Sequence, residues 1–123
     1  MFDGIQNQIS EALEKLSQEE IDKLRREFLG LPGDYLQFLY LVGYGNLGEI
    51  QLYDGLVFSS SVYPKSTNLK NIVLFSDDFQ GYCYGFDIND NYRVVEIDPW
   101  SKVDKTIDPS FSNFIYRYFP DAR

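Results

Sequence analysis

The sequence predicts an α+β domain in which N-terminal helices precede an antiparallel meander sheet of about five strands and a C-terminal helix follows. Three observations predict it: apolar residues recur at helical spacing up to Val42, the period changes to two from Ile50 to Ile97, and helical spacing returns at Phe111. The 123 residues, of which 44% are hydrophobic and 17% aromatic, suffice for one well-packed core. We therefore expect a single domain over residues 1–123.

The first helix is expected at the N-terminus. Its apolar residues recur at helical spacing and are Ile5, Ile9, Leu13 and Leu16. This spacing predicts an amphipathic helix that ends near Leu16.

A capping box marks the start of a second helix. In Ser17-Gln-Glu-Glu20 the serine side chain is able to cap the helix while the glutamate reaches back to the serine backbone. We expect this helix to end at Gly30, because glycine readily adopts the conformation in which many helices end. Its core-facing residues are Ile21, Leu24 and Phe28.

The segment Leu31-Pro-Gly-Asp34 is expected to open a third helix. Proline is preset for an early helical position, and the charge of Asp34 is favourable near the positive end of the helix. The buried stripe of this helix is Tyr35, Phe38, Leu39 and Val42.

Residues 43–48, GYGNLG, match the glycine spacing of a dinucleotide-binding loop. In such loops the glycines follow a strand and open a helix, so that the pyrophosphate meets the positive helix N-terminus. Here they follow a helix and precede the strand-like residues 49–53, which reverses the order. We therefore interpret the segment as a helix-to-strand connection and expect no cofactor.

The strands are expected to follow one another as hairpins. The apolar pattern predicts strands at 49–53, 56–58, 71–76, 81–87 and 92–97, with turns at 53–55, 77–80 and 89–91. Alternation in the strand 81–87 places Tyr82, Tyr84 and Phe86 on one face. We expect Tyr84 and Phe86 to point into the core, with Cys83, Gly85 and Asp87 on the outer face.

A closing helix is expected after Ser110, with Phe111, Phe114, Ile115 and Tyr118 on its apolar face and Pro120 at its end.

Composition restricts the class of partner. The formal net charge is −8, from 19 acidic and 11 basic residues. Phosphate backbones repel such a surface, so we expect a basic protein partner and no nucleic acid. The first residues lack the basic start and apolar run of a signal peptide, and no apolar stretch approaches the ~20 residues of a membrane span. We expect a cytoplasmic protein with no membrane partner.

The sequence offers little for catalysis. It contains no histidine, which excludes Ser-His-Asp and Cys-His arrangements, and its single cysteine, Cys83, is expected to be a buried strand thiol. Residues 87–91 resemble the start of a calcium loop, but Tyr92 stands where that loop requires glycine. We therefore expect no catalytic residue and no metal. A small carbohydrate-acting or metal-dependent enzyme is the least favoured hypothesis, because acidic residues in hairpin turns have conformational reasons to be there.

Three motifs, in order along the chain, resemble the SUKH superfamily, which is named in part for a yeast regulator of cell-wall glucan synthesis. The motifs are Leu31-Pro-x-Asp-Tyr35-x-x-Phe38-Leu39, Phe75-x-x-Asp78-x-x-Gly81-x-x-Tyr84-x-Phe86-Asp87 and Ser110-Phe111-x-x-Phe114-Ile115, and the resemblance covers about Ile21 to Tyr118. It implies an α+β fold. In bacteria it implies an immunity protein that neutralises the toxin of a contact-dependent or other polymorphic toxin system, many of whose toxins are nucleases. The alternative, from the fungal branch, is a regulator or scaffold in cell-wall or stress signalling.

We favour a binding module without catalysis. The candidate partner-binding residues are the acidic side chains Asp77, Asp78, Asp87 and Asp90, with Tyr82 as a candidate aromatic anchor. Successive turns of a meander alternate between the two ends of the sheet, so the loops at 77–80 and 88–91 should lie at opposite ends. We therefore expect no single cluster to include all four aspartates.

Overall fold

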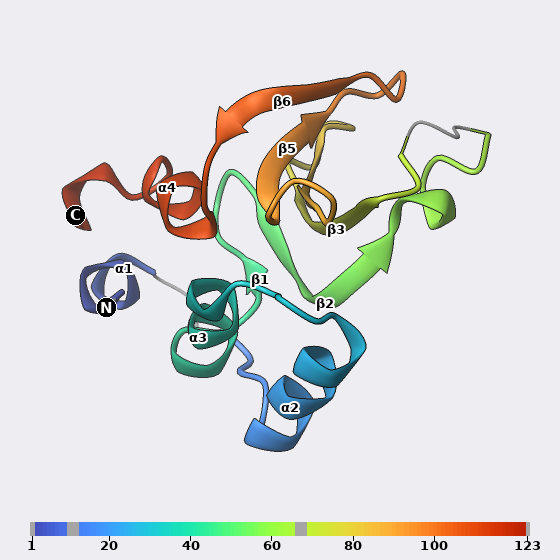
Figure 1. The fold of residues 1–123 in the computed structure, drawn as a ribbon. Coiled ribbons are helices and arrows are strands. Elements are labelled where there is room, and N and C mark those ends of the chain that lie inside the picture. Colours follow the sequence, from blue (N-terminus) through green and yellow to red (C-terminus); the bar gives the residue numbers. More distant parts are fainter. Residues whose placement is uncertain (1, 10–12, 66–68, 123) are drawn as a thin grey trace.

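The structure, a computed structural model, describes residues 2–9, 13–65 and 69–122 (Figure 1). Within these residues helices pack on an antiparallel sheet whose strands follow the chain in the order β1-β2-β3-β4-β5-β6. The predicted α+β class, with N-terminal helices, a meander and a C-terminal helix, is confirmed.

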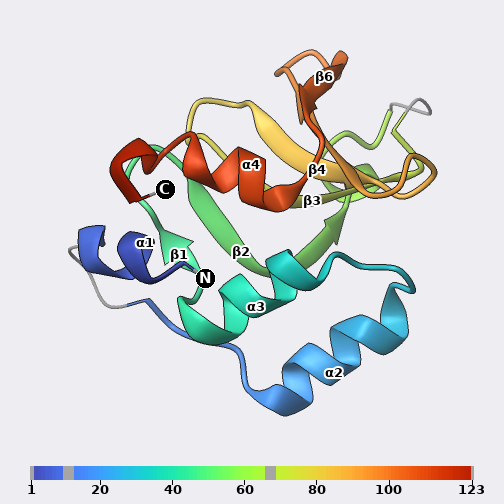
Figure 2. The same ribbon diagram turned by 60° about the vertical axis from the view of Figure 1, so that its left-hand side comes forward.

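The element bounds show how the chain is distributed. The helices are α1 (Asp3–Gln8), α2 (Gln18–Glu27), α3 (Gly33–Leu41) and α4 (Phe111–Tyr116), with short 3-10 turns η1 (Ser59–Ser61) and η2 (Pro120–Ala122). The strands are β1 (Gly45–Asn46), β2 (Gln51–Phe58), β3 (Ile72–Asp77), β4 (Cys83–Asp87), β5 (Arg93–Ile97) and β6 (Val103–Asp108). Figure 2 shows α3 and α4 lying across one face of the sheet, with α1 close to the C-terminal turn.

The predicted starts of α2 and α3 are confirmed. Ser17 Oγ accepts the Glu20 amide at 3.2 Å, and the Glu20 carboxylate accepts the Ser17 amide at 3.0 Å, which completes the capping box. Asp34 accepts the Tyr35 amide at 2.8 Å and also both the amide and the hydroxyl of Ser112, at 2.9 and 2.7 Å. This carboxylate therefore joins the first turn of α3 to the first turn of α4.

The predicted length of the first helix is wrong. α1 ends at Gln8, and residues 10–12, over which the helix was expected to continue, lie outside the described residues. Further along, Glu14 forms an isolated antiparallel bridge with Tyr44, and the Leu16 amide donates to Leu39 O. The backbone at Glu14 and Leu16 thus pairs with distant backbone groups instead of with its own helix.

The helix-to-strand interpretation of GYGNLG is confirmed. Gly43 follows α3 with a φ of 118°, and a Cβ at this position would collide with the carbonyl oxygen of Glu14. Gly45 and Asn46 form the short strand β1, which pairs with β2 and was not predicted.

The predicted turn at residues 53–55 is wrong, because β2 runs without a break from Gln51 to Phe58. Its pairing with β3 shifts register between Leu52 and Val57, so Asp54 and Gly55 lie in a bulge of this strand. A Cβ on Gly55 would lie 3.8 Å from Leu24 Cδ2, so α2 packs directly on the bulge. β6 was not predicted either: it is an edge strand with three consecutive exposed residues, and it lacks the buried apolar residues that β3 to β5 contain.

The main core lies between the helices and one face of the sheet. The sheet contributes Val73, Phe75, Tyr84, Phe86 and Val94 to it. The predicted inward orientation of Tyr84 and Phe86 is confirmed, since they are 6% and 0% exposed. The predicted buried stripe of α3 is confirmed as well.

The opposite face of the sheet is also covered, which the sequence did not lead us to expect. A second cluster of buried side chains contains Leu69, Ile72, Leu74, Cys83, Val95 and Ile97, and Tyr53, Val57, Tyr63 and Val103 pack against it. Cys83, Gly85 and Asp87 are therefore buried, and the outer face predicted for them is not open to solvent. A Cβ at Gly85 would lie 2.6 Å from Val73 O, so only glycine fits there.

Tyr35 offers a test of the packing at the centre of the main core. It is fully buried, and its hydroxyl makes no hydrogen bond with any residue that the structure describes. Because a buried unsatisfied hydroxyl is destabilising, Tyr35→Phe is expected to raise the free energy of unfolding by about 1 kcal/mol. Urea denaturation of both proteins measures the difference, and a loss of stability on removal of the hydroxyl would contradict this environment for Tyr35.

Candidate functional site

The predicted partner-binding residues lie at the two ends of β4. Asp77 pairs with Cys83 at the start of this strand, and Asp87 pairs with Arg93 at its end. This register confirms that the loops at 77–80 and 88–91 occupy opposite ends of the sheet. The four aspartates do not form one cluster.

Asp87 is engaged within the protein. It is 4% exposed, its Oδ2 lies 3.0 Å from Lys105 Nζ, and its Oδ1 accepts the Asn89 amide at 3.1 Å. Its carboxylate is therefore already paired with groups of the protein itself. Asp90, in the turn that follows, is exposed.

The end that carries Asp77 combines two turns that contact one another. A Cβ at Gly81, in the β3–β4 turn, would lie 3.1 Å from Pro99 Cγ in the β5–β6 turn. We call the surface formed by Asp77, Asp78, Phe79, Asp98 and Trp100 the tip surface. It joins residues from two separate hairpins.

An aspartate side chain stabilises each of the two turns by accepting hydrogen bonds from backbone amides. Asp78 Oδ1 accepts the amides of Gln80 and Tyr82, at 2.9 and 3.1 Å. Asp98 Oδ1 accepts the amides of Trp100 and Lys102, at 2.8 and 2.9 Å. In each case a carboxylate fixes the amides two and four residues ahead, so the turn holds its shape without a partner.

Each turn presents an aromatic side chain to solvent. Trp100 is 81% exposed and Phe79 is 52% exposed, and Phe79 has a left-handed φ of 64°. The sequence reasoning did not select either residue. Two signals could have found Trp100: it is the chain's single tryptophan, and it follows Asp98-Pro99, a dipeptide typical of an exposed turn.

Tyr82 lies at the margin of the tip surface. It precedes β4, is half-buried, and its amide is bonded to Asp78. It is less accessible than Phe79 or Trp100, so it is the weaker candidate for an anchor.

Asp77 is the structural carboxylate of the tip surface. Burial disfavours its charge, but hydrogen bonds from the Tyr53 hydroxyl at 2.6 Å, the Gln51 amide at 2.9 Å and the Phe79 backbone outweigh that effect and lower the pKa of Asp77. A carboxylate with a lowered pKa in the folded state stabilises the fold above its ordinary pKa, and this stabilisation is lost as the pH falls through the folded value.

Asp77→Asn is therefore expected to cost about 1 kcal/mol of unfolding free energy at neutral pH, and the cost should shrink as the pH falls below about 4. Denaturant unfolding at a series of pH values measures this difference. Asp90→Asn, at an exposed turn position, is the control and should change stability little at any of these pH values. A pH-independent cost for Asp77→Asn would show that the charge of Asp77 is not what stabilises this turn.

Cys83 and two tyrosines pack together among the buried side chains near the tip surface. Burial raises the pKa of the Cys83 thiol, which disfavours the thiolate that a nucleophile requires. Burial also raises the pKa of Tyr53 and Tyr63, which lie against the same cysteine. Among the residues that the structure describes, no three potential metal-ligating side chains come together.

Comparison with protein-family models and with curated protein sequences finds no match. None of the helices in the described part of the chain combines the length and the apolar character that crossing a membrane requires.

Proposed function

We propose that this chain is a non-catalytic immunity protein that acts in the cytoplasm, where it binds and neutralises a cognate toxin with a basic surface. The proposal joins the motif resemblance to the geometry of the tip surface. The single observation that carries it is an exposed tryptophan and an exposed phenylalanine on two contacting turns that also carry Asp77, Asp78 and Asp98.

The aromatic pair has the character of an interface anchor. Tryptophan is among the residues most enriched where interfaces concentrate their binding energy, and apolar side chains exposed together on a polar surface are typical of interaction sites. Because Asp78 and Asp98 already fix the backbone of the two turns, a partner need not order these turns on binding. Pre-organisation of this kind favours tight binding.

The charge of the surface favours a basic partner. The two turns carry three carboxylates, those of Asp77, Asp78 and Asp98, and Lys102 is their one basic residue. Within a chain of net charge −8, such a surface attracts a positively charged cleft and speeds the encounter at low salt. The nucleic-acid groove of a nuclease toxin has this chemistry.

The test uses the toxin encoded beside the gene for this chain. We expect the purified proteins to bind, with an association rate that falls as the salt concentration rises. Asp78→Asn with Asp98→Asn removes two charges but keeps the oxygen that accepts the turn amides, so it should slow association by about tenfold at low salt and leave dissociation nearly unchanged. Asp90→Asn with Asp121→Asn removes two charges elsewhere and is the control. Absence of binding, or association insensitive to both salt and the tip charges, would refute the proposal.

A further inference from the structure

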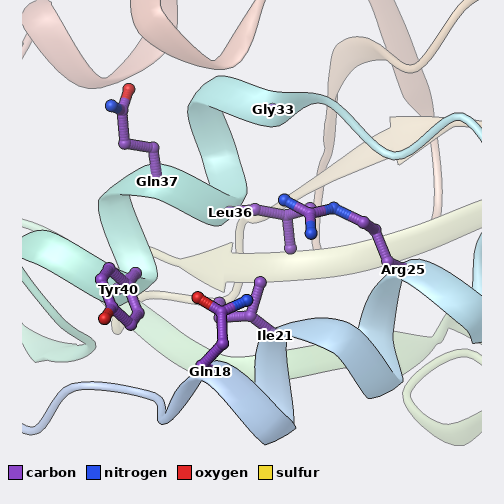
Figure 3. A pocket seen from close by; sticks show the side chains of 7 residues that line it. All are labelled: Gln18, Ile21, Arg25, Gly33, Leu36, Gln37 and Tyr40. Carbon is purple, nitrogen blue, oxygen red and sulfur yellow. The ribbon is translucent and has the colours of Figure 1, made fainter.

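A second surface lies on the helical layer, away from the tip surface. α2 and α3 enclose a groove of about 380 Å³, lined by Gln18, Ile21, Arg25, Gly33, Leu36, Gln37 and Tyr40 (Figure 3). Each helix contributes residues that recur with its own period, so the groove follows both helix faces. Nothing in the proposed toxin-binding role uses it.

The floor of the groove is apolar and its rim is polar. Ile21 and Leu36 form the floor, at 3% and 2% exposure, and Tyr40 is 45% exposed at the side. In Figure 3 the side chain of Arg25 reaches from α2 toward Leu36, and Gln18 and Tyr40 lie toward the other end. Such a combination suits a ligand with an apolar group for the floor and polar groups for the rim.

The lining of the groove is free of acidic side chains. The chain has 19 acidic residues, yet none of the seven lining residues is acidic and one is an arginine. Asp22, outside the groove, forms an ion pair with Arg25 at 3.4 Å and accepts from Gln18 at 2.9 Å. A guanidinium has five N–H donors, so Arg25 retains donors for a carboxylate in the groove.

The dimensions favour an extended segment over a helix. A helix with its side chains is about 10–12 Å wide, whereas about 380 Å³ accommodates only two or three side chains. The amides of Gln18 and Gln37 carry both donors and acceptors, as does the backbone of an extended chain. Gly33 leaves the entrance open, because a Cβ there would meet nothing within 4 Å.

We infer that the α2–α3 groove binds a short extended peptide segment in which an acidic side chain is flanked by apolar ones. The acidic side chain pairs with Arg25, and an apolar neighbour covers Ile21 and Leu36. This site is separate from the tip surface and binds a ligand of opposite charge, so it permits a second partner to bind at the same time.

The test uses fluorescein-labelled acetyl-Gly-Leu-Glu-Leu-Gly-amide and two matched peptides with Gln or Lys in place of Glu. Fluorescence anisotropy with the full chain should give a Kd below about 1 mM for the Glu peptide and about tenfold weaker binding for the Gln peptide. The Glu peptide should shift the amide resonances of Gly33, Leu36 and Gln37 in a nitrogen-15 NMR spectrum. Tighter binding of the Lys peptide, or equal binding of all three, would overturn the inference, as would no binding of the Glu peptide.

Variants locate the site. Arg25→Gln should reduce binding of the Glu peptide to the level of the Gln peptide, and Gly33→Phe should abolish binding by filling the entrance. Lys23→Gln removes the same charge from the same helix at a position that does not line the groove, so it should leave binding unchanged. Equal loss in Lys23→Gln and Arg25→Gln would show an unspecific charge effect and would overturn the inference. Because no toxin takes part, this result is independent of the proposed function.

Discussion

Phe75→Ala is expected to lower the free energy of unfolding by about 3–5 kcal/mol, because it opens a cavity at the centre of the main core. Phe75 lies on β3 and is fully buried. Its ring centroid lies within 6 Å of four other aromatic rings, those of Tyr35, Phe86, Phe111 and Phe114, at 5.9, 4.5, 5.6 and 5.2 Å. The cavity is bounded by α3, α4 and β4, three elements that cannot collapse around it together.

Chemical denaturation measures this effect, and the chain provides a matched control. Phe79→Ala removes the same side chain at a position that is 52% exposed, and it should change stability by less than about 0.5 kcal/mol. Typical domains have an unfolding free energy of about 5–15 kcal/mol. Phe79→Ala should therefore leave most of this free energy at neutral pH, whereas Phe75→Ala should remove a large part of it. Similar losses in the two variants would contradict the central position assigned to Phe75.

The double substitution Phe79→Ala and Trp100→Ala is expected to weaken toxin binding by about 2 kcal/mol or more, which is roughly a 30-fold increase in Kd. The change should lie mainly in the dissociation rate, because the acidic residues that guide encounter remain in place. Neither side chain is buried in the free protein, so the thermal unfolding midpoint should stay within a few degrees of the wild-type value.

Leu29→Ala is the control for the tip substitutions. Leu29 is 84% exposed, so it is as accessible as Trp100, but it follows α2 at the opposite end of the sheet, where its carbonyl accepts the Tyr92 hydroxyl at 2.9 Å. It should leave toxin affinity unchanged. A greater loss for Leu29→Ala than for the tip variant would place the interface at the other end of the sheet.

Local signals in the sequence predicted those elements whose cause is local. The capping box at Ser17 and the Asp34 turn each bring their own hydrogen-bond partners, so α2 and α3 begin where the sequence places them. The turn at 77–80 is likewise held by its own aspartates, and the turn at 89–91 by Asp87 just before it, and both turns were predicted.

The elements that were missed depend on distant contacts. Leu13 and Leu16 continue the helical spacing of α1, but Glu14 and Leu16 bond to Tyr44 and Leu39, and periodicity carries no information about those partners. β6 is an edge strand whose charged residues interrupt the apolar pattern by which strands are recognised in a sequence. Asp54-Gly55 lies in a bulge of β2, although the same dipeptide commonly forms a hairpin turn.

The candidate site was predicted in part, for the same reason. Asp77 and Asp78 were selected and lie on the tip surface, but Trp100 and Asp98 reach it only through the β5–β6 hairpin, which requires β6. The burial of Asp87 also depends on β6, because Lys105 on that strand is its ion-pair partner. A strand without an apolar pattern thus decides both which residues join the tip surface and how Asp87, at the other end of the sheet, is paired.

Survival of cells that express the neighbouring toxin tests the central claim most directly. Co-expression of the wild-type chain or of Leu29→Ala should restore growth, whereas the Phe79→Ala, Trp100→Ala double variant, present at the same soluble level, should fail to restore it. Growth restored equally by the double variant would show that the tip surface is not the interface, and death of cells that express the wild-type chain would contradict the immunity function itself.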